Sequence, residues 1–106
     1  MILVRPSLRA PHSPIGNIQN AVAAYYELPP LHMVSAQRGH MIAHPRQIAM
    51  YLASELTTKS LVEIGKRFGG RDHSTVLHAI KQVKKRIAND PSIAADVAAL
   101  RKALAG

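Results

Sequence analysis

The sequence predicts an all-α fold, a small helical domain with a central helix-turn-helix. Apolar residues recur at spacings of three and four along the chain from Ile15 onward, which is the pattern of amphipathic helices. No segment shows the alternation of apolar and polar residues that a strand requires. With 106 residues, the chain has room for one domain with a modest core. We expect a flexible arm over residues 1–14, which hold three of the seven prolines, and one folded domain over residues 15–106.

The first half of the chain predicts two helices separated by prolines and a loop. The apolar face of the first helix is formed by Ile15, Ile18, Val22 and Tyr25. The pair Pro29-Pro30 should stop this helix, and a short helical turn is expected over residues 31–35. The segment SAQRGHMIAHP indicates a loop, because it combines a glycine with mixed polarity. Pro45 suits a first helical position, where its missing N–H costs nothing, so a second helix is expected over about 45–57.

Two further helices are expected over about 60–68 and 73–89, joined by the turn Gly69-Gly70. The letters SLVE form a capping box, in which the Ser60 hydroxyl accepts a hydrogen bond from the N–H of Glu63. Glycine tolerates the left-handed conformation that commonly ends a helix, so the two glycines should end the first helix of the pair.

The helix expected over about 73–89 has two different faces. Asp72 precedes it as a candidate N-cap. Its apolar stripe consists of Val76, Ile80, Val83 and Ile87. A polar and basic stripe on the opposite side consists of Ser74, His78, Lys81 and Lys85. One face should therefore pack inward and the other should meet solvent, and Asp90-Pro91 should begin a last helix.

The net charge favours a polyanionic partner. The chain carries 14 Lys and Arg against six Asp and Glu, a formal charge of +8. Residues 59–86 hold eight basic and two acidic side chains, so most of the excess lies in one part of the chain. DNA, RNA and anionic membranes attract such charge. The alternative is a basic surface that only keeps the protein soluble.

The absence of cysteine excludes disulfides and thiolate metal sites, and it suits a cytosolic protein. No apolar run approaches the ~20 residues of a membrane span. The N-terminal residues have the wrong order for a signal peptide. We therefore expect a soluble, cytoplasmic protein that does not enter membranes; an association with the nucleoid is expected only if the protein binds DNA.

Two consecutive helices joined by a tight glycine turn are typical of a helix-turn-helix. In that geometry, the N-terminal residues of the second helix reach base edges in the major groove. Arg can donate to guanine, Asp can accept from cytosine, and His, Ser and Thr can contact either kind of group. The alternative for Asp72 is a cap alone, for His73 an exposed position beside that cap, and for the lysines a solvated helix face.

Catalysis and metal binding are weaker hypotheses. Asp72, His73 and Ser74 are residue types found in catalytic triads, but adjacent residues at a helix start point in different directions. His40 and His44 are four apart, as in zinc-binding helices, but no carboxylate or thiol accompanies them. The chain has no G-x-x-x-x-G-K-[ST] loop for nucleotide phosphates. We expect no enzymatic activity, no metal, no cofactor and no bound nucleotide.

The run SLVEIGKRFGGRDHSTVLHAIKQV resembles the signature of the C-terminal DNA-binding domain, domain IV, of the DnaA family of bacterial replication initiators. The resemblance continues upstream without gaps through PRQIAMYLASELT and IGNIQNAVAAYY, so that it covers about residues 15–90. It implies an all-helical domain of the TrpR/DnaA type that binds double-stranded DNA as a monomer, at short asymmetric DnaA boxes. The implied role is regulation or initiation of replication, without the ATPase domain of the family.

By position, the resemblance implies two sets of DNA contacts. Base contacts would come from Arg38 in the minor groove and from Leu61, Arg71, Asp72, His73, Ser74 and Thr75 in or near the major groove. Phosphate contacts would come from Arg46, Gln47, Ser60, His78, Lys81 and Lys85. Several features depart from the family's frequent residues: the loop AQRGHMIAH carries fewer Lys and Arg beside Arg38, Ser54 replaces a basic residue, Val62 a proline and Ser74 a threonine. Because the signature turn is intact, base reading should persist, with weaker phosphate binding or an altered site preference.

Other functions remain open. The chain could be a transcriptional regulator of phage or mobile-element origin, or a protein-interaction module without DNA binding. RNA binding is less favoured, because residues for base stacking are few, with one Phe and three Tyr.

Overall fold

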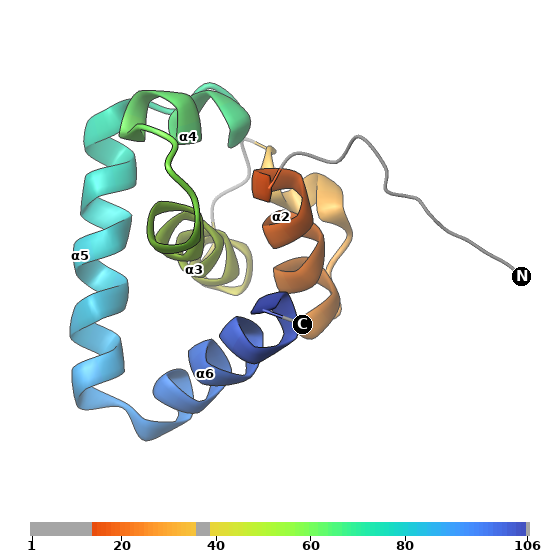
Figure 1. The fold of residues 1–106 in the computed structure, drawn as a ribbon, viewed down its shortest axis with the longest axis vertical. Coiled ribbons are helices and arrows are strands. Elements are labelled where there is room, and N and C mark those ends of the chain that lie inside the picture. The colour runs from red at the N-terminus through yellow and green to blue at the C-terminus, as the bar shows by residue number, and fades with distance from the viewer. Residues whose placement is uncertain (1–13, 36–38, 106) are drawn as a thin grey trace, which may run out of the picture.

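The computed structural model describes residues 14–35 and 39–105. Its elements in chain order are α2 (Pro14–Tyr25), the short 3-10 helix η2 (Pro30–Met33), α3 (His40–Leu56), α4 (Leu61–Arg67), α5 (His73–Asn89) and α6 (Pro91–Ala105). Within those ranges there is no strand, which confirms the predicted all-α class. Helix α3 runs through the middle of the domain, with α2, α4, α5 and α6 around it (Figure 1). The arm expected over residues 1–14 lies outside the described residues except for Pro14, which begins α2.

The core is built from the apolar stripes that the sequence predicts. Each long helix contributes fully buried side chains, among them Ile18 and Val22 of α2, Ile48 and Leu52 of α3, Ile64 of α4, Val76 and Val83 of α5, and Val97 and Leu100 of α6. Phe68, directly after α4, is also completely buried. Burial of one large apolar side chain stabilises the fold by about 1.5–3 kcal/mol. The buried side chains of α4 and α5 pack into the same hydrophobic core, which fixes the position of both helices in the domain.

Helix α2 ends before the prolines that were expected to stop it. The backbone N–H of Leu28 donates to the carbonyl of Ala23, and that of Glu27 donates to Ala24. This is the Schellman pattern, and Glu27 has the positive φ of 57° that the pattern requires. A backbone motif ends the helix at Tyr25, and the proline pair only begins the next turn, η2.

Helix α3 begins earlier than predicted, because Pro45 does not occupy its first position. The N–H groups of Ile42 and Ala43 both donate to the carbonyl of Gly39, and the helix starts there at His40. Pro45 lies inside the helix, where its missing N–H removes one hydrogen bond. The predicted loop over residues 40–44 was therefore wrong, and these residues form the first turn of α3.

Three predictions for the second half of the chain are confirmed. The Ser60 hydroxyl accepts from the N–H of Glu63 at 3.1 Å, and α4 follows directly. Helix α5 has the expected bounds. The Asp90 carboxylate accepts from the N–H of Ser92 at 3.0 Å at the start of α6.

Helix α6 is tied to the rest of the domain by polar side chains as well as by its apolar face. The hydroxyls of Tyr25 and Tyr26 donate to the two carboxylate oxygens of Asp96, at 2.6 and 3.0 Å. Arg101 donates to both carboxylate oxygens of Glu55 at the end of α3. The Arg101 hydrogen bonds hold the pKa of Glu55 below its ordinary value. These links fix α6 against α2 and α3.

Candidate nucleic-acid interface

The turn between α4 and α5 is compact because glycines occupy it. Gly69 and Gly70 have φ values of 83° and 76°, in the left-handed region that favours glycine. Gly65, inside α4, lies directly against the start of the next helix: its carbonyl accepts the N–H of Arg71 at 2.8 Å. A Cβ atom on Gly65 would overlap the carbonyl oxygen of Arg71. The two helices therefore approach at a distance that only a residue without a side chain allows.

The first turn of α5 presents four consecutive polar side chains, those of Asp72, His73, Ser74 and Thr75, and all four are exposed. The Ser74 hydroxyl donates to the Asp72 carboxylate, and His73 Nδ1 lies 3.3 Å from its other oxygen. The hydrogen bond from Ser74, followed by the charge of His73, holds the pKa of Asp72 below its ordinary value. This row of side chains meets solvent at the helix start.

Asp72 occupies the predicted N-cap position of α5. Its carboxylate makes no hydrogen bond of standard capping geometry, and its main partner is the Ser74 hydroxyl. The backbone N–H groups of Ser74 and His73 have smaller effects, which also lower the pKa of this carboxylate. The predicted position of the cap is therefore confirmed, whereas the standard side-chain cap bond is not formed.

The polar stripe along α5 is where the sequence predicts it. Ser74, His78, Lys81 and Lys85 are all exposed, whereas Val76 and Val83 on the other side are fully buried. In the part of the chain that the structure describes, ion pairs involve Lys59, His73 and Arg101, but no lysine of α5. The ammonium groups of α5 therefore face solvent and can meet a partner.

Other predicted contact residues are engaged within the protein. Arg46 is only 5% exposed, and its Nε donates to the carbonyl of His32 at 3.2 Å. Burial and then the nearby charge of Arg71 lower the pKa of Arg46. Gln47 is half-buried and accepts a hydrogen bond from Arg86 at 2.9 Å.

Three further predicted residues differ in their accessibility. Ser60 is exposed at the start of α4, and Leu61 is half-buried against the core. Arg38 lies outside the described residues. The structure thus brings together the residues around the α4–α5 turn but does not place the minor-groove arginine.

Arg71 points its guanidinium group back into the protein. Nη1 donates to the carbonyl of Phe68, and Nη2 donates to the carbonyl of Ser35 at 2.8 Å. The side chain is half-buried as a result. The role of Ser35 was missed from the sequence, because a backbone carbonyl acceptor leaves no signal in the pattern of side chains.

The residues suggested for catalysis or metal binding do not form such a site. Ser74 donates to Asp72 directly, whereas a triad places the imidazole between hydroxyl and carboxylate. His44 Nδ1 lies 2.8 Å from Nη1 of Arg86, and the side chain of His40 lies outside the described part. Among the described residues, no three His, Asp or Glu side chains form a group that could hold a metal ion.

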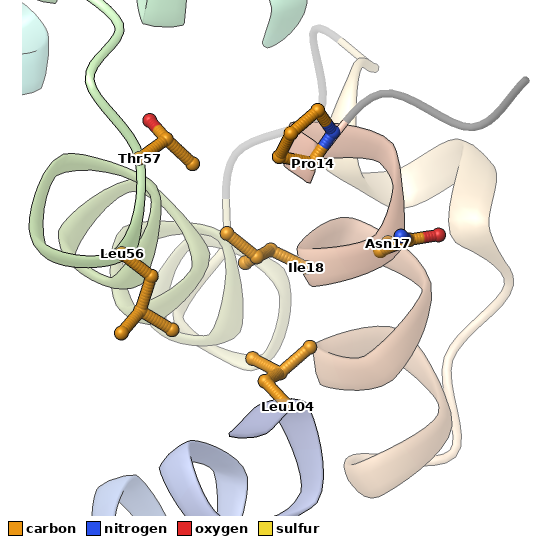
Figure 2. Close-up of a pocket in the computed structure, with 6 residues that line it drawn as sticks. All are labelled: Pro14, Asn17, Ile18, Leu56, Thr57 and Leu104. Carbon is orange, nitrogen blue, oxygen red and sulfur yellow. The ribbon is translucent and has the colours of Figure 1, made fainter. Parts of the chain in front are cut away.

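One small pocket lies away from the α4–α5 turn. It has a volume of about 150 Å³ and is lined by Pro14, Asn17, Ile18, Leu56, Thr57 and Leu104. Figure 2 shows the side chains of Ile18, Leu56 and Leu104 around it, from three different helices. None of these lining residues is titratable, and the Thr57 hydroxyl donates to the carbonyl of Ala53. Across residues 14–35 and 39–105, no helix is both long and apolar enough to cross a membrane.

The compact turn, the buried stripe and the exposed helix start define a helix-turn-helix domain. Residues 15–83 match the family described as "Bacterial dnaA protein helix-turn-helix". The chain therefore belongs to this family of DnaA-type helix-turn-helix domains.

Several relatives similar to this chain are described as chromosomal replication initiator protein DnaA. The protein of Sphingopyxis alaskensis is 50% identical over 94 residues, which are 89% of this chain and 21% of the relative. That of Caulobacter sp. strain K31 is 43% identical over 106 residues, 98% of this chain and 22% of the relative. That of Anaplasma marginale is 50% identical over 92 residues, 85% of this chain and 20% of the relative. The chain thus spans about a fifth of the length of the curated relatives it matches.

Proposed function

We propose that this domain binds double-stranded DNA sequence-specifically, at DnaA-box-like sites, in the regulation or initiation of replication. The observation that carries the proposal is the row of four exposed polar side chains at the start of α5, on a DnaA-type helix-turn-helix. In this class of motif, the N-terminal residues of the second helix contact base edges. We further propose that the domain acts as a monomer on an asymmetric site.

The proposed roles follow from chemistry and exposure. Asp72, His73, Ser74 and Thr75 offer one acceptor, one imidazole and two hydroxyls to the bases of the major groove. Leu61, half-buried at the start of α4, offers apolar contact to a thymine methyl group. Arg38 is assigned to the minor groove by the resemblance alone.

Phosphate contacts are assigned to exposed groups on the two helices. They are Ser60 at the start of α4 and His78, Lys81 and Lys85 along the polar stripe of α5. Arg46 and Gln47 are also proposed as phosphate contacts, although both side chains already make hydrogen bonds within the protein. Gln47 would donate from its amide nitrogen, which leaves the bond from Arg86 to its Oε1 intact, and Arg46 would have to bring an N–H group of its buried guanidinium to the surface.

Binding of a duplex that carries a DnaA box, compared with a scrambled duplex of equal composition, tests the proposal. The log of the binding constant should fall with the log of salt concentration, at a slope near −0.9 for each neutralised phosphate. His73→Ala should weaken box binding by about 1–3 kcal/mol with little effect on the scrambled duplex, whereas Lys81→Ala should weaken both alike. Lys102→Ala, on the exposed part of α6, is the matched control for loss of one positive charge.

Two results would overturn the proposal. Equal affinity of the wild-type domain for box and scrambled duplexes would remove sequence specificity. Identical behaviour of the His73 and Lys81 variants would remove the division between base reading and phosphate binding. Affinity for a protein partner without affinity for any duplex would favour an interaction module instead.

A further inference from the structure

Arg71 is held in place from several sides at the start of α5. Its backbone N–H donates to the Gly65 carbonyl of α4. Its guanidinium group donates to Phe68, at the end of α4, and to Ser35, which is 36 residues earlier in the chain. One side chain therefore joins the turn of the helix-turn-helix to the segment between η2 and α3.

A second, independent contact lies at the same place. A Cβ atom built on Gly69 would overlap the carbonyl oxygen of Val34 and would lie 3.0 Å from Nη1 of Arg71. The turn is therefore packed directly on the Val34–Ser35 backbone, with no space for a side chain between them. Gly69 permits this close approach, and the guanidinium group of Arg71 bonds across it.

The chemistry of arginine explains why this residue suits the position. Its planar guanidinium group presents several N–H donors in a fixed arrangement, so it can serve two carbonyl groups at once. A lysine ammonium is a compact charge with three rotatable donors on a flexible chain, and it lacks this rigid planar arrangement. If Arg71 turned toward the DNA to contact a base through the same two nitrogens, the carbonyls of Phe68 and Ser35 would lose these donors. This loss opposes a turn of the side chain toward the DNA.

We propose that Arg71 is a positioning residue for DNA recognition: its guanidinium group bonds the turn to the Val34–Ser35 segment and thereby fixes the direction of the first turn of α5. The side chains that follow, His73 to Thr75, reach their bases at correct positions because Arg71 holds the helix start. This inference rests on the proposed function, because it concerns how the same surface achieves specificity.

The experiment compares Arg71→Lys and Arg71→Ala with the wild-type domain and with Lys102→Ala. Each protein is titrated with a DnaA-box duplex, with a scrambled duplex and with a set of boxes that each carry one base-pair change. All titrations are made well below the melting temperature of each variant, so that unfolding does not contribute. Melting temperatures without DNA are recorded for all four proteins.

Arg71→Lys should reduce the ratio of box to scrambled affinity about tenfold, which is within the range of one or two lost base discriminations. Its affinity for the scrambled duplex and its salt slope should stay near the wild-type values, because the positive charge is retained. The loss should be spread over all base pairs read by residues 73–75. Both variants should melt at lower temperature than the wild type, Arg71→Ala more than Arg71→Lys.

Three outcomes would overturn the inference. Loss of discrimination at one base pair alone would make Arg71 a direct reader. An unchanged affinity ratio in Arg71→Lys would show that the bonds to Phe68 and Ser35 do not serve recognition, even if the melting temperature falls. Unchanged melting temperatures in both variants would show that the bonds contribute nothing in solution. If the wild-type domain itself does not prefer the box, the proposed function fails first, which distinguishes the two failures.

Discussion

The start of α5 and the attachment of α6 use similar residues in opposite ways. Around α6, the polar groups bond to one another: Asp96 accepts from two tyrosines, and Arg101 pairs with Glu55. At the start of α5, the polar side chains from Asp72 to Thr75 face solvent and contact only their immediate neighbours. Both regions belong to the same domain and pack on the same core. Burial alone therefore does not explain why polar groups bond within the protein at α6 and face solvent at α5.

The comparison indicates which basic side chains are available to a DNA partner. Four of the arginines, Arg46, Arg71, Arg86 and Arg101, each donate to groups of the protein. The lysines of α5 remain exposed. Arginine suits internal bonding because its donors form a rigid fork, and lysine suits a solvated surface. The formal charge of +8 therefore overstates the charge that a polyanion meets directly.

The largest predicted effect is at the contact between α4 and α5. Gly65→Ala would place a methyl group on the carbonyl oxygen of Arg71, which is backbone and cannot turn away. We expect a loss of about 3 kcal/mol in the free energy of unfolding, together with loss of box discrimination. Urea denaturation and a duplex titration measure the two effects. A loss below about 1 kcal/mol would contradict this prediction, because the backbone at Arg71 could then move away from the methyl group with little loss of stability.

Two adjacent glycines offer a matched pair for the next effect. Gly69 and Gly70 both have positive φ, so alanine at either position costs about 1 kcal/mol in backbone strain. Only Gly69 meets a neighbour, the Val34 carbonyl, whereas nothing lies within 4 Å of a Cβ atom at Gly70. Gly69→Ala should therefore destabilise the domain by about 2 kcal/mol or more, and Gly70→Ala by about half of that. Equal losses in thermal melting would contradict the close packing at Gly69.

A smaller loss of stability is expected for a change at α6, and this change should leave DNA discrimination unaltered. Asp96→Ala removes the acceptor for the hydroxyls of Tyr25 and Tyr26 and should cost about 1 kcal/mol of stability. The ratio of box to scrambled affinity should stay at the wild-type value. Altered discrimination in this variant would mean that the two regions are coupled.

The same variant tests the dependence of stability on alkaline pH. Burial, followed by the hydrogen bond to Asp96, raises the pKa of Tyr26 above its ordinary value. The neutral phenol is therefore favoured in the folded state. Its contribution is complete below the pKa of an unfolded tyrosine, about 10, and is lost as the pH rises through the folded value. Urea midpoints between pH 8 and 11 should fall less steeply in Asp96→Ala than in the wild type.

Much of the helix-turn-helix could be predicted from the sequence because its signals are local. The Ser60–Glu63 cap, the two glycines and the Asp90-Pro91 pair each act within a few residues. Helix α5 has the expected extent, α4 is one residue shorter at each end than expected, and α6 begins at Pro91 as expected. The exposed stripe of α5 follows from helical periodicity in the same way. The exposure of Asp72 to Thr75 and of the α5 stripe could therefore be predicted from the sequence, whereas their contacts with DNA stay a prediction.

The remaining features depend on backbone groups that no side-chain pattern indicates. The start of α3 is set by the Gly39 carbonyl, without a side-chain cap, and the end of α2 by the Schellman bonds around Glu27. The bond from Arg71 reaches a carbonyl 36 residues away. The Asp72 carboxylate accepts from the Ser74 hydroxyl and makes no standard cap bond to the backbone, and the sequence alone does not indicate which of these donors it will bond.

The bonds from Tyr25 and Tyr26 to Asp96 also bear on the order in which the domain assembles. They connect residues 71 and 70 positions apart, so most of the domain must be synthesised before they can form. Contacts between α4 and α5 span far fewer residues and require little loop closure. On the ribosome, α2 can pack on α3 and α4 can pack on α5 before α6 has been made, and the bonds to Asp96 form only afterwards. The helix that folds onto the domain last is thus one that meets neither bases nor phosphates in the proposed complex.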